Sequence, residues 1–212
     1  MMKLKVCGMK EEKNILEVAE LKPDYMGFIL YEKSPRCIHS SIARLVRDLE
    51  IKKVGVLVNE DISDIKKHLD MYHFDALQLH GDEDQALTEE IRLNYPDLTI
   101  IKAFGVDELF NFNSIKVFEA SCDYFLFDTK TREYGGSGKI FDWKLLEDVK
   151  SPTPIFLSGG IGAEELFEPF DRQHIFAIDV NSKVEDRPGI KNLKKVKEIR
   201  NIIDRWNGTQ EL

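Results

Sequence analysis

Eight short apolar runs, separated by stretches of mixed polarity, constrain the fold of this 212-residue chain more than any other feature. Apolar runs bounded by turn signals are typical of buried strands in a parallel sheet, where both faces are covered. The runs cover residues 4–6, 26–30, 54–58, 76–79, 100–104, 124–127, 155–157 and 177–180.

Helical patterns fill the intervals between these runs. Apolar residues recur there three and four positions apart, which gives each segment one apolar face. Ser40 and Asp82 carry side chains suited to an N-cap. The segments after the fifth and seventh runs are weaker, and residues 110–119 are the weakest. We expect helices over residues 14–19, 40–49, 62–71, 82–91 and from Asn192 onward.

Strict alternation of strand and helix predicts a parallel α/β protein. Eight such units in 212 residues indicate a single-domain (β/α)₈ TIM barrel that spans residues 1–212, near the small end of the range for this fold. An open doubly wound sheet would need a glycine-rich turn after a strand, and none follows the first. The sequence YGGSGK at 134–139 is not a Walker motif, since Ile140 follows its lysine.

The composition is that of a soluble globular protein, with 42% hydrophobic and 32% charged residues. A net charge of −8 argues against a nucleic-acid partner, because such proteins usually carry a basic surface. No apolar run reaches the length of a membrane span, and the N-terminus lacks the apolar segment of a signal peptide. We therefore expect a cytoplasmic protein without a nucleic-acid or membrane partner, either a monomer or a homodimer.

The cysteines Cys7, Cys37 and Cys122 are an odd number at wide spacing. Without a secretory signal, this pattern disfavours disulfides. No CxxC pair occurs, so we expect no structural zinc and no other metal. Cys7 stands where the first strand turns into a loop, a place that favours a thiol in a site over a core residue.

Polar side chains recur at the ends of the predicted strands, where barrels of this kind place their chemistry. Gln78 and His80 share one face by the two-residue period of a strand, and Lys5 shares a face with Cys7. Lys5 is thus placed to supply positive charge to the thiol. A ring of such groups favours a site over the accidents of loop starts. The ring comprises Cys7, Arg36, Gln78, His80, Lys102, Asp128 and Asp179.

Two loops have the composition of a phosphate site. SGGIGAEE at 158–165 follows the seventh strand, and DVNSK at 179–183 follows the eighth. Glycines let backbone N–H groups approach an anion, and the loops after strands seven and eight are the usual phosphate site of this fold. We predict that Gly159, Gly160, Asn181 and Ser182 bind a phosphate.

The loop after the sixth strand, residues 129–143, is long and rich in glycine. Gly135 and Gly136 are suited to act as hinges and to line the site. A long loop of this kind beside a site suggests a lid, although it could also be a plain surface loop.

Seven motifs in register resemble the phosphoribosylanthranilate isomerases of tryptophan biosynthesis. They span nearly the whole chain, and no single one would be specific. They are KVCGM, SPRCI, VGVLVN, LQLHGDE, FLFDTKTREYGGSGKIFDW, LSGGI and DVNSKVEDRPGIK.

The resemblance implies an isomerase that performs an Amadori rearrangement on a phosphorylated small molecule, with no cofactor and no metal. It implies that Cys7 is the general base, Asp128 the general acid, and Arg36 the ligand of the substrate carboxylate. A thiol is a weak base at pH 7 unless its thiolate is favoured, and an aspartic acid needs a raised pKa. Asp179, His80 and Lys5 would line the site.

Two residues depart from the family pattern. Lys183 stands where the family usually has a small residue, often glycine, and Asn192 where it often has aspartate. A lysine does not readily copy a left-handed glycine, but it brings a cation to the phosphate loop. The alternatives are another phosphate-binding barrel enzyme acting on a sugar phosphate, and a non-catalytic protein that uses Cys7 as a redox-sensing thiol.

Overall fold

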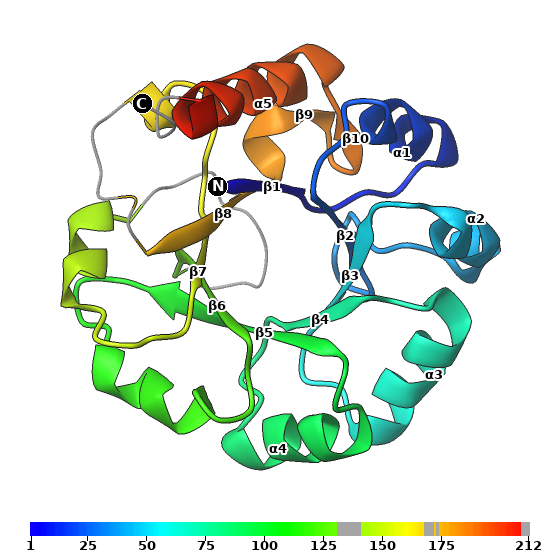
Figure 1. Cartoon of the computed structure of the whole chain (residues 1–212). Coiled ribbons are helices and arrows are strands. Elements are labelled where there is room, and N and C mark those ends of the chain that lie inside the picture. The colour runs from blue at the N-terminus through cyan, green and yellow to red at the C-terminus, as the bar shows by residue number, and fades with distance from the viewer. Residues whose placement is uncertain (131–140, 168–171, 173, 209–212) are drawn as a thin grey trace.

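The computed structural model describes residues 1–130, 141–167, 172 and 174–208. Parallel strands close into a barrel in chain order, with the last strand paired to the first (Figure 1). This confirms the predicted (β/α)₈ barrel. The strands are β1 (Lys3–Val6), β2 (Tyr25–Ile29), β3 (Lys52–Leu57), β4 (Ala76–Leu79), β5 (Thr99–Val106), β6 (Tyr124–Thr129), β7 (Ile155–Leu157) and β8 (Ile175–Val180).

Helical segments surround the barrel on its outside (Figure 1). The α-helices are α1 (Glu12–Ala19), α2 (Ala43–Asp48), α3 (Ile62–Tyr72), α4 (Gln85–Asn94) and α5 (Leu193–Gly208). The described segments that follow β5, β6 and β7 are 3₁₀ turns instead. The 3₁₀ segments are η1 (Ser40–Ile42), η2 (Phe112–Phe118), η3 (Trp143–Asp148), η4 (Glu165–Phe167) and η5 (Ser182–Val184). A hairpin of β9 (Glu185–Arg187) and β10 (Ile190–Lys191) precedes α5.

One of the three predicted helix starts is confirmed and two are wrong. Asn192 caps α5, since its Oδ1 accepts the N–H groups of residues 194 and 195 at 3.0 and 3.2 Å. Asp84, not Asp82, caps α4 by accepting the N–H of Leu87 at 2.9 Å. Ser40 is the first residue of η1 and does not cap it. Instead, Nδ1 of His39 accepts the N–H of Ser41 at 3.2 Å.

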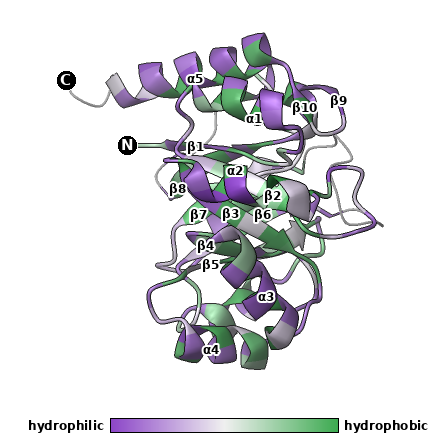
Figure 2. Cartoon of the chain, turned by 90° about the vertical axis from the view of Figure 1, so that its right-hand side faces the viewer, coloured by the Kyte–Doolittle hydropathy of each residue, from purple (hydrophilic) through white to green (hydrophobic). Residues whose placement is uncertain are grey.

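An apolar layer fills the interior of the barrel below its carboxyl ends. The layer takes side chains from seven strands and is completely or almost completely buried: Tyr25, Val54, Ala76, Ile101, Ala103, Leu126, Phe156 and Ala177. The larger core lies between the barrel and its helices, whose polar faces point outward (Figure 2). Since side chains alternate along a strand, the residue two positions beyond an interior residue also points inward.

This period places the polar groups of the site directly above the apolar layer. Gln78 lies two positions beyond Ala76, and Asp128 two beyond Leu126. Closure of the barrel pairs Lys5 on β1 with Asp179 on β8. The fold therefore brings groups from both ends of the chain into one layer.

Candidate active site

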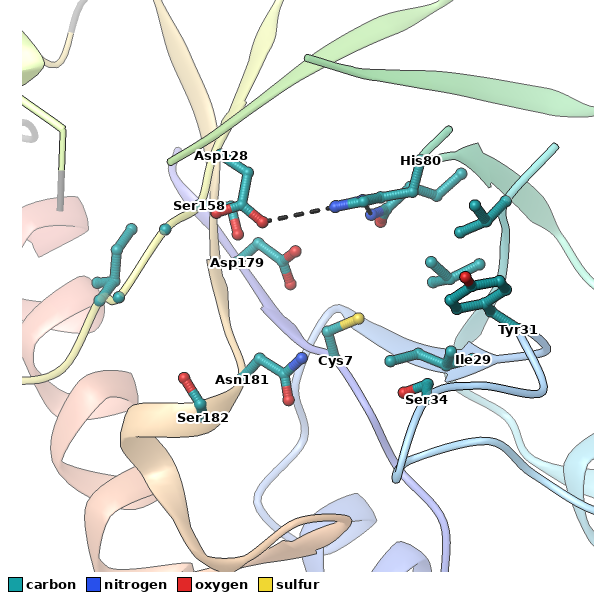
Figure 3. A pocket seen from close by; sticks show the side chains of 16 residues that line it. Cys7, Ile29, Tyr31, Ser34, His80, Asp128, Ser158, Asp179, Asn181 and Ser182 are labelled. Atoms are coloured by element: carbon teal, nitrogen blue, oxygen red, sulfur yellow. Dashed lines mark hydrogen bonds and ion pairs between the residues drawn. The ribbon is translucent and has the colours of Figure 1, made fainter. Parts of the chain in front are cut away.

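A cavity of about 660 Å³, its open mouth included, lies at the carboxyl ends of the strands. Figure 3 shows the side chains that face it from both sides. Its volume is that of a site for a small organic molecule. It is lined by Cys7, Ile29, Tyr31, Ser34, Val56, Val58, Gln78, His80, Asp128, Ser158, Gly159, Gly160, Ile161, Asp179, Asn181 and Ser182.

Cys7 follows β1, and its thiol faces the middle of the cavity (Figure 3). Its backbone N–H donates to the carbonyl of Val180 at 2.9 Å, which ties the residue to the end of β8. Gly8 turns the chain away with a φ of +73°, and a side chain there would collide with Asn181. Burial raises the pKa of the Cys7 thiol, and Lys5, which acts in the opposite direction, does not offset it.

Lys5 is fully buried beneath the thiol. Its Nζ donates to Oδ2 of Asp179 at 2.8 Å and to Oε1 of Gln78 at 2.6 Å. Burial alone would lower the pKa of Lys5, but the Asp179 carboxylate and Cys7 outweigh it and raise that pKa. The ammonium therefore stays charged inside the barrel, where it forms an ion pair with Asp179.

Asp179 points between Cys7 and Asp128 in Figure 3. Burial raises the pKa of its carboxyl despite the nearby ammonium of Lys5. Among the described residues, no hydrogen-bond partner meets its buried Oδ1. A buried carboxyl oxygen without a donor is costly to keep charged, which agrees with the raised pKa of Asp179.

Asp128 faces Cys7 across the cavity and lies beside His80 (Figure 3). Its Oδ2 is 3.5 Å from Nε2 of His80, and its Oδ1 accepts the backbone N–H of Thr129 at 2.7 Å. Nδ1 of His80 lies 2.5 Å from Nε2 of Gln78. The structure thus brings together Cys7, Asp128, His80 and the groups around Lys5.

The two predicted phosphate loops lie next to each other on one side of the cavity. Gly159 and Gly160 have φ values of +95° and +66°, which only glycine adopts readily. Asn181 and Ser182 line the same cavity from the start of η5 (Figure 3). The positive φ values of the two glycines let the backbone turn tightly beside the cavity, which suits an approach of N–H groups to an anion.

Lys183 lies at the edge of this phosphate side. Its Nζ is 3.1 Å from Oε1 of Glu165, whose Oε2 accepts the N–H of Gly162 at 2.7 Å. The expected backbone conflict is absent, because the described non-glycine residues with positive φ are only Lys22, Asn59 and His73. No sequence pattern marks Glu165 as the residue that holds this lysine.

Arg36 does not line the cavity in this structure. Its guanidinium is buried against Glu185, with Nη2 2.7 Å and Nε 2.9 Å from the carboxylate. Lys191, buried as well, donates to the same carboxylate at 2.7 Å and to Asn181 Oδ1 at 2.7 Å. Burial opposes the charge of Glu185, but Arg36 and Lys191 prevail and lower its pKa.

Sequence reasoning missed both Glu185 and Lys191. They pair across the β9–β10 hairpin, whose turn at Gly189 has a φ of +84°. The Pro-Gly step at 188–189 is a turn signal that could have located this hairpin. No local pattern could have joined it to Arg36, since 149 residues separate Arg36 from Glu185.

Lys102 was expected among the polar strand ends but lies on the outside of the barrel wall. Its Nζ donates to Glu83 at 2.9 Å and to the carbonyl of Gly81 at 2.8 Å. The physical reason is the two-residue period, which turns Lys102 away from the interior positions of Ile101 and Ala103. Lys102 thus fixes the loop after β4 instead of facing the cavity.

The side of the cavity opposite the phosphate loops is apolar. Ile29, Val56 and Val58 line it, together with the ring of Tyr31 (Figure 3). The apolar pattern marks Ile29, Val56 and Val58 only as strand residues, and it does not single out Tyr31. The cavity therefore has one side suited to an anion and another suited to an aromatic or aliphatic group.

Some predictions concern residues outside the described ranges. Gly135 and Gly136, and with them most of the proposed lid, fall between residues 130 and 141. Among the described residues, no three His, Cys, Asp or Glu side chains are grouped as metal ligands would be. Within the same ranges, no helix combines the length and apolarity that crossing a bilayer requires.

Comparison with known proteins gives a consistent result. Residues 4–201 match the family model described as N-(5'phosphoribosyl)anthranilate (PRA) isomerase. An N-(5'-phosphoribosyl)anthranilate isomerase of Parabacteroides distasonis is 41% identical over 200 residues, which cover 92% of this chain and 90% of that protein.

Two solved structures have the same fold over nearly their whole length. Phosphoribosyl anthranilate isomerase from Thermotoga maritima aligns with a TM-score of 0.81 at 34% identity, covering 96% of this chain and 100% of that one. A phosphoribosyl anthranilate isomerase in complex with reduced 1-(o-carboxyphenylamino)-1-deoxyribulose 5-phosphate aligns with a TM-score of 0.80 at 29% identity, covering 97% and 100%.

Proposed function

This chain belongs to the N-(5'-phosphoribosyl)anthranilate isomerase family, and on that premise we propose how its site carries out the reaction. The substrate is N-(5-phosphoribosyl)anthranilate, and the product is 1-(2-carboxyphenylamino)-1-deoxyribulose 5-phosphate, formed in tryptophan biosynthesis. The observation that carries the proposal is the placement of Cys7 and Asp128 on one cavity, between an anion-suited side and an apolar side.

The two sides fix the direction in which the substrate lies. The phosphate binds at Gly159, Gly160, Asn181 and Ser182, where backbone N–H groups and short polar side chains face the cavity. The anthranilate ring packs against the opposite side, formed in part by Tyr31. The ribose then spans the middle, within reach of the thiol and of the carboxyl groups of Asp128 and Asp179.

Ring opening is the task of Asp128. Its carboxylic acid gives a proton to the furanose ring oxygen, the C1–O bond breaks, and the anthranilate nitrogen supplies the electron pair that forms the iminium. Asp128 is left as a carboxylate, which accepts the Thr129 N–H on Oδ1. A hydrogen-bond donor aimed at a developing charge stabilises the transition state.

Proton abstraction is the task of Cys7. Its thiolate takes the proton from C2, and the electron pair neutralises the iminium to give an enolamine. The enolamine becomes the aminoketose when C1 gains a proton and the C2 hydroxyl loses one. Lys5 lies beneath the thiol and favours its charged form, although burial works against it. Asp179 lines the cavity on the ribose side of the thiol, where its carboxyl group would meet the sugar.

We assign the anthranilate carboxylate to Arg36, which lies just outside the cavity lining, beside Gly8 and Asn181. Its hydrogen bonds to Glu185 use Nε and Nη2, so the substrate would meet the guanidinium at Nη1. Glu185 holds the arginine in place at the base of the loop after β2. A guanidinium is suited to this task because its planar donors match a carboxylate.

The test is an assay of the purified protein with freshly prepared N-(5-phosphoribosyl)anthranilate, followed by the loss of anthranilate-type fluorescence. Cys7→Ala and Asp128→Asn should each lower kcat by at least roughly 100-fold, because each removes a positioned base or acid. Cys37→Ala, a thiol outside the cavity, is the matched control and should keep its activity. Wild-type turnover in either active-site variant would refute the assignment of that residue.

A further inference from the structure

A line of polar groups runs from the buried Lys5 and Gln78 to the partly exposed His80 and Asp128. Nζ of Lys5 donates to Oε1 of Gln78 at 2.6 Å, and Nε2 of Gln78 lies 2.5 Å from Nδ1 of His80. Nε2 of His80 then lies 3.5 Å from Oδ2 of Asp128. These groups come from β1, the end of β4 and β6, and Gln78 is only 1% exposed.

The donors and acceptors in this line permit only one arrangement. An ammonium group has donors and no acceptor, so the amide oxygen of Gln78 must face Lys5. The amide NH₂ therefore faces His80, and Nδ1 must offer a lone pair to it. The ring proton of the neutral imidazole is then on Nε2, the nitrogen that faces Asp128.

We propose that Gln78, held by Lys5, fixes His80 in the Nε2–H tautomer so that His80 donates a hydrogen bond to Asp128 during ring opening. Gln78 is thus a positioning residue that acts through His80. The inference rests on the proposed role of Asp128 as general acid.

The arrangement would stabilise the charge that develops on Asp128 during ring opening. When Asp128 transfers its proton to the ring oxygen, negative charge develops on its carboxyl group. The Thr129 N–H meets Oδ1, and the Nε2–H of His80 faces Oδ2, so both oxygens have a donor. The distance of 3.5 Å is long for a hydrogen bond, and such contacts often tighten when substrate binds.

The opposite tautomer would work against the same step. With the proton on Nδ1, Nε2 would turn a lone pair toward the carboxylate and would repel the developing charge. A chain that places an amide donor at Nδ1 excludes this state without placing any charge on the ring. The lysine orients the amide, and the amide in turn selects the tautomer.

The tautomer can be measured in the free protein by ¹H–¹⁵N NMR of the ¹⁵N-histidine-labelled chain, with His80→Gln identifying the signal among the five histidines. We expect neutral His80 with its proton on Nε2. Gln78→Glu puts an acceptor at Nδ1 and should move a proton there. Gln78→Met, which is near in size and uncharged, should leave a mixture of tautomers. Circular dichroism verifies that each variant is folded.

Both Gln78 variants should lower kcat roughly 10- to 100-fold, the usual loss when the partner that orients a functional imidazole is removed. KM should change less than kcat, because the ground-state contacts with substrate remain. Gln85→Glu makes the same change on the exposed face of α4 and should leave kcat and the His80 signal unaltered. His80→Gln, which keeps an N–H donor, should retain more activity than His80→Leu.

A wild-type His80 protonated on Nδ1, or a signal unchanged in both Gln78 variants, would overturn the inference. So would a changed tautomer with an unchanged kcat. These outcomes are distinct from a failure of the proposed function, since the NMR measurement needs no substrate. If Asp128→Asn stayed active, the acid assignment would fall while the measured tautomer still stood.

Discussion

The Cys7 thiol faces the cavity, but its surroundings disfavour the thiolate that a general base requires. Lys5 lies where the sequence predicted it, and it lowers the pKa of the thiol. Burial acts more strongly and raises that pKa above its ordinary value of 9.0. The free protein therefore holds Cys7 mainly as a thiol at neutral pH.

This sets the pH dependence of catalysis. A general base works only when deprotonated, whereas the general acid must be protonated, so the base is best followed in Asp128→Asn, which lacks the acid. There the residual kcat/KM should rise with pH, about tenfold per unit, up to the raised pKa of Cys7. The assay is a kcat/KM profile of this variant from pH 6 to the alkaline limit of protein stability. Adding Cys37→Ala should reproduce the same profile. A curve for Asp128→Asn that is flat across this range would show that the thiol is not the titrating base.

Gly27 provides a second prediction at the scale of one residue. A Cβ at this position would lie 2.6 Å from Sγ and 3.1 Å from Cα of Cys7, too close for either atom to stay in place. Gly27→Ala should therefore displace the thiol and lower kcat by roughly 100-fold, since misplacement by about 1 Å can cost that much. Gly208→Ala meets no atom within 4 Å and should leave kcat unchanged. Equal kcat values for the two variants would contradict this.

At the scale of elements, the β9–β10 hairpin connects the loop after β2 to the loop after β8. Glu185 on β9 accepts hydrogen bonds from Arg36, from Lys191 and from the N–H of Gly189 at 3.0 Å. The side chains of Glu185, Arg36 and Lys191 are each at least nine-tenths buried. Burial lowers the pKa of Lys191 despite its carboxylate partner, so the network depends on the charge of Glu185.

Removing the negative charge of Glu185 should destabilise the folded protein. Glu185→Gln leaves two buried cations without a counter-ion and should lower the free energy of unfolding by about 3–5 kcal/mol. Urea denaturation at pH 7 measures this change. Glu198→Gln, on the exposed surface of α5, is the control and should change stability little. A small loss in Glu185→Gln would mean that the network can rearrange around an amide.

Wild type and Glu185→Gln should also differ in how their stability depends on pH in the acid range. The pKa of Glu185 is lowered in the folded state from its ordinary value of 4.5. Its contribution to stability is therefore full above 4.5 and is lost as the pH falls through the lower folded-state value. Wild-type stability should decline more steeply than that of Glu185→Gln in this acid range.

Lys183 and η5 provide the prediction for the phosphate side. Lys183→Ala removes the cation paired with Glu165 and leaves an uncompensated carboxylate beside the phosphate loop. We expect KM to rise by up to about fivefold, because a half-exposed ion pair contributes roughly 1 kcal/mol at most. Added salt should shrink the difference by screening. Lys195→Ala, on α5, is the control. An unchanged KM at low salt would show that Lys183 does not influence the phosphate.

Prediction from sequence succeeded for elements wherever a repeating pattern determined the structure. The strands were predicted because buried parallel strands are continuously apolar, and their order followed from β–α alternation. Asp82 was a wrong cap because two aspartates stand two positions apart, and only the contact with Leu87 distinguishes Asp84. The segments after β5 to β7 are 3₁₀ turns, and their faint helical pattern did not distinguish these from α-helices.

At the scale of the whole molecule, closure of the barrel assembles the site. The sequence could predict that Cys7, His80 and Asp128 stand at strand ends, because the fold collects those ends at one rim. It could not predict which polar groups touch. Lys5 and Asp179 are 174 positions apart, and their contact exists only after β8 has paired with β1.

The pairing of β1 with β8 has a consequence for how the protein folds. Until β8 docks, the amine of Lys5 has no counter-ion, and a half-finished barrel cannot keep a charged group in its interior. Contacts between such distant positions form late, because the intervening chain must lose its freedom first. We therefore predict that the surroundings of the residue-7 thiol are completed by the final strand, so that activity appears during refolding no earlier than the pairing of β8 with β1.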